Sequence, residues 1–391
     1  MPEVHARLSA SSAKRWLTCP PIIALEELSG IKDRTSSYAE EGTEAHSLSE
    51  LKLRRYLVKP KEARKIDLEI EAFKKSASWY DQEMEEATEL YVGYVEEIYN
   101  SHSNLAQMEL EQQVQFDKWV PGGFGTSDVV ITSPEVIEII DLKYGKGIKV
   151  EAYQNPQLML YALGAFEKYD WLYDFEKVRM TIVQPRLEWM DTFEVATEEL
   201  LYWANNYVAP RAALADQGIG EWTITEDVMR FSKVRGRLRP EYEANKNFIE
   251  KYEYQEGALL EPEDLSEILA QADQIKRWLM DVESFALQSI LDGGEVPGFK
   301  VVAGRSVRKI SDPVELAKRL EDAGFDEKAI FKAPQLETLG NLEKLVGKKE
   351  FESLSEGTII KPEGKPTLAP ESDKRPAINS TQDAIEDFKD L

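Results

Sequence analysis

The stretch Val136-Ile137-Glu138-Ile139-Ile140-Asp141-Leu142-Lys143 decides our expectation for the fold. Apolar side chains occupy both alternating sets of positions, which is typical of a central strand that is buried on both faces. A second apolar run, Asp128-Val129-Val130-Ile131, precedes it, and Ser133-Pro134-Glu135 between the two runs favours a hairpin turn. We therefore predict two antiparallel strands that bring Asp128 close to Asp141.

The segments around this pair show helical and strand periodicities in turn. Helical patterns cover residues 36–57, 67–100, 153–168 and 197–217, with short helices within 8–30, and strand patterns cover 108–116, 178–184 and 191–196. The order helix, three-strand meander, helix, strand predicts a mixed α/β (α+β) core, with a central mixed sheet flanked by helices.

Aromatic residues are distributed unevenly along the chain, since the last tyrosine is Tyr254 and the last tryptophan is Trp278. We therefore expect a large packed domain over residues 1–257 with helical insertions. A smaller α/β appendage is expected over residues 258–355, with a long helix at 261–291, a hairpin around Gly304 and a helix that begins at Asp312-Pro313. The prolines and polar residues of 356–391 predict a disordered tail.

The overall composition excludes several classes of protein. The 48 basic and 72 acidic residues give a net charge of −24, which argues against a broad non-specific coat on DNA. A small basic track or a bound cation can still reverse the field locally. The single cysteine, Cys19, excludes a disulfide framework and a cysteine-rich zinc or iron–sulfur site. Because neither a membrane span nor a signal-peptide pattern is present, we expect a cytoplasmic protein.

The candidate catalytic residues lie at the end of the predicted strand at 136–143. Strand alternation puts Asp141 and Lys143 on one face, near Asp128. Two converging carboxylates need a counter-ion, and a divalent cation is the usual one. A lysine beside them can orient a water and stabilise a pentacovalent phosphate, so the pattern favours metal-assisted phosphodiester hydrolysis. The alternative is a solvated Asp-x-Lys face, against which the burial of the strand argues.

Two helices offer further candidate residues. His46, one of three histidines, lies near the start of the 36–57 helix and could add a nitrogen ligand; the alternative is an ordinary surface histidine. Gln157 and Tyr161 lie at i and i+4 of the 153–168 helix, so they share a face. They could bond a DNA phosphate or order the lysine, and the alternative is a tyrosine that caps the core.

Taken in order, Gly42-Thr43-x-x-His46, Asp128, Asp141-Leu142-Lys143 and Gln157-x-x-x-Tyr161 resemble the RecB-like branch of the PD-(D/E)XK nuclease superfamily. The N-terminal stretch from Leu8 to Pro20 is similar to the same branch. More narrowly, the chain resembles a phage- and prophage-borne family first described as a domain of unknown function. By motif, the resemblance covers residues 8–200.

The resemblance implies a restriction-endonuclease-like core and a Mg²⁺- or Mn²⁺-dependent deoxyribonuclease, an exonuclease that acts in phage DNA recombination or processing within the bacterial host cytoplasm. Some relatives hold an iron–sulfur cluster on four cysteines, and this chain has Cys19 alone, so no cluster is expected. One or two metal ions would be bound. The implied roles are metal ligands for His46, Asp128, Asp141 and the carbonyl of Leu142, the catalytic lysine for Lys143, and a helix motif beside the site for Gln157 and Tyr161.

Basic residues supply the candidate DNA contacts: Lys146, Lys149, Arg186, Lys233, Arg235, Arg237 and Arg239. For the run at 230–239, the alternative is a solvated helix face paired with the acids at 241–250. DNA is the expected partner, a phage single-strand annealing or other recombination protein is a candidate partner, and oligomerisation is left open. The alternative functions are a catalytically silent DNA-end or partner-binding protein and a structural phage protein.

Overall fold

The computed structural model describes residues 6–31, 37–102, 105–250 and 260–302, together with isolated positions between 315 and 355. The chain divides into two compact units, 1–302 and 303–391, and every element named below belongs to the first. The predicted domain boundary at 257–258, the start of the hairpin-and-helix region at Gly304 and Asp312, and the predicted tail at 356–391 lie outside the described residues.

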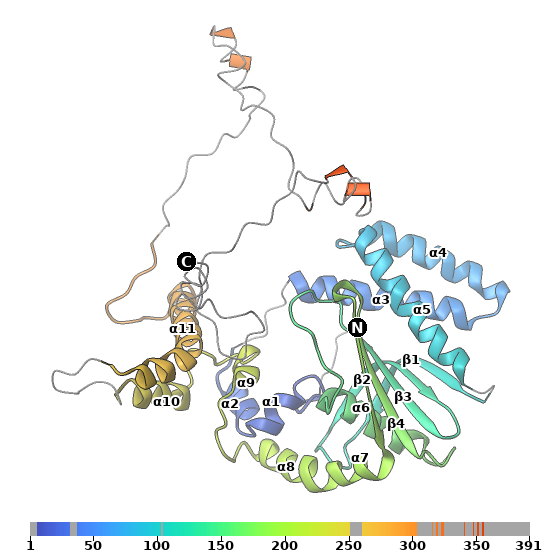
Figure 1. Ribbon diagram of the computed structural model, residues 1–391, viewed down its shortest axis with the longest axis horizontal. Coiled ribbons are helices and arrows are strands. Elements are labelled where there is room, and N and C mark those ends of the chain that lie inside the picture. Colours follow the sequence, from blue (N-terminus) through green and yellow to red (C-terminus); the bar gives the residue numbers. More distant parts are fainter. Residues whose placement is uncertain are drawn as a thin grey trace, which may run out of the picture. The chain divides into compact units, whose positions relative to one another are not determined.

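A five-stranded mixed sheet forms the centre of the first unit, in the order β1-β2-β3-β4-β5 (Figure 1). Its strands are β1 (Gln107–Gln115), β2 (Phe124–Thr132), β3 (Val136–Leu142), β4 (Lys177–Gln184) and β5 (Trp189–Ala196). Strands β3 and β4 are parallel, and the other neighbours are antiparallel. The parallel pair needs a crossover connection, which contains α6 (Pro156–Tyr169). The predicted mixed α+β class and the β2–β3 hairpin are confirmed.

Strand β3 is the centre of the sheet, and all seven of its residues are buried. On one face, Ile139 belongs to the same core as residues of α6 and of α1 (Ala13–Thr18). On the other face, Ile140 belongs to a second core with Tyr91 of α5 (Gln82–Ser101). Two cores explain the unbroken apolar run, because each face of the strand needs its own apolar side chains.

The helices before the sheet are α1, α2 (Ile22–Leu28), α3 (Ser37–Leu57), α4 (Pro60–Ser76) and α5. The prediction of one helix over 67–100 is wrong, because the chain leaves the helical conformation between α4 and α5. Asp81 is the physical reason, since its carboxylate accepts a hydrogen bond from the N–H of Met84 at 2.8 Å and so caps a new helix. The apolar stripe continued across this break and concealed it.

The helices after the sheet begin with α7 (Thr197–Trp203) and α8 (Ala209–Gln217), which are joined by a π-helical turn at Ala204–Val208. The predicted helix at 197–217 therefore carries a local widening just before Pro210, whose ring cannot follow a regular helical turn. Next come α9 (Glu226–Arg230), α10 (Arg239–Glu250) and α11 (Pro262–Leu291). None of the described helices is both long enough and apolar enough to cross a bilayer.

Candidate functional site

The β2–β3 hairpin brings two carboxylates to one place. Val129 pairs with Ile140, so Asp128 and Asp141 are the next residues along the two strands. Asp128 Oδ2 accepts a hydrogen bond of 2.7 Å from the backbone N–H of Leu142, which fixes its side chain across the end of β3. Asp141 is 2% exposed. The convergence that the sequence predicts for these two acids is present in the structure.

Lys143 is held beside these acids by two elements. Its Nζ lies 2.9 Å from Asp141 Oδ2 and donates to Gln157 Oε1 at 3.1 Å. Gln157 Nε2 in turn donates to the hydroxyl of Tyr161 at 3.2 Å. Asn155 caps α6 through the N–H of Gln157, which fixes the first turn of that helix next to β3. The geometry thus brings the α6 pair to the lysine.

His46 reaches the same point from α3. Its Nδ1 lies 3.2 Å from Asp128 Oδ1. The buried residues of α3, among them Ala45 and Leu48, hold this side of the helix against the rest of the unit. The structure therefore gathers His46, Asp128, Asp141 and Lys143 at one point. The strand pattern predicts this for the last three, and the resemblance implies it for His46.

Burial and neighbouring charges shift the pKa values of the groups in this cluster in opposite directions. Burial alone would lower the pKa of His46, but the charge and hydrogen bond of Asp128 raise it to about 9. Burial would raise the pKa of Asp128, but His46 and the Leu142 N–H hold it below its usual value. Asp141 keeps a raised pKa, because burial and the charge of Asp128 outweigh the attraction of Lys143.

Glu111 of β1 joins His46, Asp128 and Asp141 at the site, and the sequence analysis missed it. One carboxylate oxygen of Glu111, one of Asp128 and a ring nitrogen of His46 lie within 4.8 Å of one another. Leu110 pairs with Val129 and Gln112 with Ser127, which places Glu111 opposite Asp128. Its backbone has a φ of 46°, a left-handed conformation that is rare in a strand. The alternating pattern of 108–116 could have indicated Glu111, if the pairing of the hairpin had been extended to this strand.

A small void lies among these side chains. It measures about 10 Å³, and Glu50, Glu111, Asp128, His46 and Leu142 are among the residues that line it. A void of this size holds one water or one ion. It adjoins a cavity of about 720 Å³ that shares four of these residues, so the point is reached from a wider opening. Carboxylate oxygens with one imidazole suit a hard divalent cation, so the residues fit the predicted Mg²⁺ or Mn²⁺.

The predicted DNA-contacting residues do not line this cavity. Most are engaged elsewhere: Lys146 with Glu83, Arg186 with Glu41 and Glu83, Arg235 with Asp281, Arg239 with Glu243, Lys149 over the Trp189 ring and Arg237 over the Phe285 ring, while the backbone N–H of Lys233 donates to Glu26. The 231–238 part of the basic run forms turns instead of a helix, and Arg239 is the member that pairs with an acid of 241–250.

Comparison with known proteins defines the family. A model of the family described as "Protein of unknown function (DUF2800)" matches residues 5–376. The chain belongs to this family. This DUF2800 chain is similar to a solved structure titled "Crystal structure of SSO0001". The match covers 58% of this chain and 96% of that one, with 16% sequence identity and a TM-score of 0.23. A likeness of that size carries no argument, so the proposals below depend on the geometry of this chain.

Proposed function

We propose that this chain is a Mg²⁺- or Mn²⁺-dependent deoxyribonuclease with a RecB-like PD-(D/E)XK core, an exonuclease that acts on phage DNA during recombination or processing. The supporting observation is the cluster at the end of β3. His46, Glu111 and Asp128 lie around an ion-sized void, and the Asp141–Lys143 pair lies beside Asp128. Buried ionisable groups with shifted pKa values, placed at an opening, are typical of catalytic sites.

Each side chain has a distinct role in this proposal. The donor set for the cation would be His46, Asp128, Glu111, Asp141 and the carbonyl of Leu142. When bound, the cation would neutralise negative charge on the phosphate and make a bound water more acidic. Lys143 is held between Asp141 and Gln157, so its ammonium group is positioned to donate a hydrogen bond to a phosphate oxygen or to the attacking water.

The decisive experiment is digestion of end-labelled linear DNA and closed circular DNA by the full chain, with Mg²⁺, with Mn²⁺ and with EDTA. We expect release of label from linear DNA with either metal, little loss of the circle, and no release in EDTA. Equal loss of linear and circular DNA would replace the exonuclease by an endonuclease. Absence of cleavage with both metals would overturn the proposal.

One observation favours the second candidate, a catalytically silent DNA-end or partner-binding protein. His46 pairs with Asp128 and Lys143 pairs with Asp141, so much of the cluster's charge is balanced by the chain itself. Titration calorimetry with Mn²⁺ separates the two candidates. Saturable heat that is lost in Asp128→Asn favours the nuclease, and the absence of site-specific heat favours the silent protein.

A further inference from the structure

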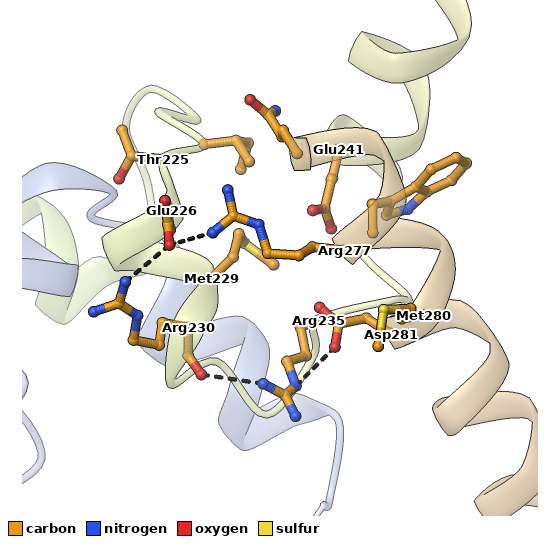
Figure 2. A pocket seen from close by; sticks show the side chains of 12 residues that line it. Thr225, Glu226, Met229, Arg230, Arg235, Glu241, Arg277, Met280 and Asp281 are labelled. Atoms are coloured by element: carbon orange, nitrogen blue, oxygen red, sulfur yellow. Dashed lines mark hydrogen bonds and ion pairs between the residues drawn. The ribbon is translucent and has the colours of Figure 1, made fainter. Parts of the chain in front are cut away.

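A second cavity, of about 200 Å³, lies among α9, α10 and α11 (Figure 2). Its apolar walls come from Ile224, Met229, Trp278 and Met280. Its charged residues are three arginines and three acids, namely Arg230, Arg235, Arg277, Glu226, Glu241 and Asp281. None of these residues lines the cavity at the carboxylate cluster of the sheet. The site is therefore separate from the proposed catalytic centre.

The arginines of this cavity are paired with two of its three acids. Glu226 accepts from Arg230 at 2.8 Å and forms an ion pair with Arg277, and Arg235 lies 3.3 Å from Asp281. Figure 2 shows these contacts as dashed lines, while the Glu241 carboxylate has none drawn to it. Glu241 is the acid of the lining that pairs with none of these three arginines.

Glu241 is 5% exposed, and within the described part of the chain its Oε2 has no hydrogen-bond partner. A buried acceptor without a donor is unfavourable, and native structures contain few of them. Burial, and then the charge of Asp281, raise the pKa of Glu241 to about 7 although the backbone N–H of Gly236 counteracts them. The cavity therefore presents a buried carboxyl group with one oxygen, Oε2, that lacks a donor, and a ligand with N–H groups would supply one.

The chemistry of the lining narrows the ligand. With Glu241 ionised, three acids balance three arginines in the lining, so a neutral group placed against Glu241 keeps that balance and a cationic group does not. A carboxylate is matched by two adjacent N–H donors, and the tryptophan and methionine walls suit a flat ring. Guanine is a neutral flat ring with two such donors, N1–H and the 2-amino group. The three arginines are already paired with Glu226 and Asp281, so a phosphate attached to the base would compete with those acids for them.

We propose that this cavity binds the guanine base of a nucleotide, with Glu241 accepting hydrogen bonds from N1–H and the 2-amino group. Adenine has an acceptor at N1, so the same carboxylate meets a lone pair in place of a donor. A site built to bond an N–H group rejects an analogue that lacks it. This inference does not depend on nuclease activity.

The test is titration calorimetry of the full chain with 5′-GMP, 5′-AMP and benzamidine. We expect saturable binding of 5′-GMP, at least tenfold weaker binding of 5′-AMP, and no tighter binding of benzamidine than of 5′-GMP. Glu241→Gln should weaken 5′-GMP binding about tenfold or more, because a hydrogen bond to a charged group is lost. The matched control is Glu243→Gln on the same helix, an exposed acid paired with Arg239, which should leave binding unchanged.

The outcomes are separable. Equal binding of 5′-GMP and 5′-AMP, no binding of 5′-GMP at millimolar concentration, or full binding by folded Glu241→Gln would each overturn the proposal, and preference for benzamidine would make this an organic-cation site. The comparison of 5′-GMP with 5′-AMP uses the wild-type chain, so it tests the proposal even if Glu241→Gln does not fold. Unchanged 5′-GMP binding by Asp141→Asn would show that the site survives failure of the nuclease proposal. A guanine-ended oligonucleotide that binds more tightly than 5′-GMP would identify DNA as the source of the base.

Discussion

The carboxylate cluster at the end of β3 and the carboxyl group of Glu241 are both buried, yet they are stabilised in opposite ways. In the sheet, His46 and Lys143 provide positive partners for Asp128 and Asp141 within the chain. Among the helices, the nearby arginines pair with Glu226 and Asp281 instead, and Glu241 Oε2 has no partner in the described residues. The comparison shows that burial alone does not identify a site. At Glu241 it is the missing partner of Oε2 that indicates what the site could bind.

The largest expected effect tests the sheet side of this comparison. Asp141→Asn keeps the shape of the side chain but removes the charge that positions Lys143. We expect cleavage of end-labelled DNA to fall on the order of a thousandfold, comparable to losing a central electrostatic group. The control is Asp117→Asn, an exposed acid outside the cluster. Cleavage by purified, folded Asp141→Asn at the wild-type rate would refute the site assignment.

The second prediction concerns Glu241 and the pH dependence of the free energy of unfolding. The folded chain keeps the proton of Glu241 up to about pH 7, while the unfolded chain loses it near 4.5, so stability falls as pH rises through that window. The loss amounts to roughly 2–3 kcal/mol by pH 8. Glu241→Gln should lack this part of the pH dependence, because the amide does not ionise. Urea unfolding at pH 5 and pH 8 measures it, and identical pH dependence in variant and wild type would contradict the raised pKa.

A third prediction asks whether β1 belongs to the metal site. Glu111→Gln removes one carboxylate from the donor set, and we expect Mn²⁺ affinity to fall by about tenfold to a hundredfold, similar to the loss of other metal-site partners. Glu109→Gln is the control, since Glu109 lies on the same strand but pairs with Lys168. If both variants bind Mn²⁺ like the wild type, the donor set is confined to His46 and the hairpin.

The smallest expected effect concerns the positioning of Lys143. Gln157→Leu removes the side chain that accepts its hydrogen bond, and we expect kcat to fall about tenfold while Mn²⁺ affinity stays unchanged. This split distinguishes a positioning role from a structural one, because a disturbed fold would also weaken metal binding. Gln157→Glu, which restores an acceptor oxygen, should recover part of kcat. Loss of metal affinity in Gln157→Leu would show that the residue supports the fold instead.

The sequence allowed prediction of the features that depend on local pattern. Alternation along 136–143 and the short turn before it were enough to predict the hairpin, because pairing across a tight turn fixes the register. The meeting of Asp128, Asp141 and Lys143 followed from that register. His46 was harder to place, since its helix lies far away in sequence, and its position beside Asp128 was expected from the resemblance.

The features that the sequence did not reveal depend on contacts between distant segments. Glu111 became part of the site only through the β1–β2 pairing and its left-handed backbone. The cavity at Glu241 needs α9, α10 and α11 together, and no local pattern indicates which acid will lack a partner. The break before Asp81 was concealed because an apolar stripe reports burial, whereas helix ends depend on capping.

The position of the cluster on β3 links the proposed chemistry to the slowest motions of the molecule. β3 is paired on both edges and covered on both faces, and the N–H of Lys143 extends the ladder by donating to Val183 at 2.9 Å. Amides in such a strand exchange with solvent chiefly through global unfolding. The acids therefore keep their spacing for as long as the domain remains folded, and local fraying of the outer helices leaves that spacing intact.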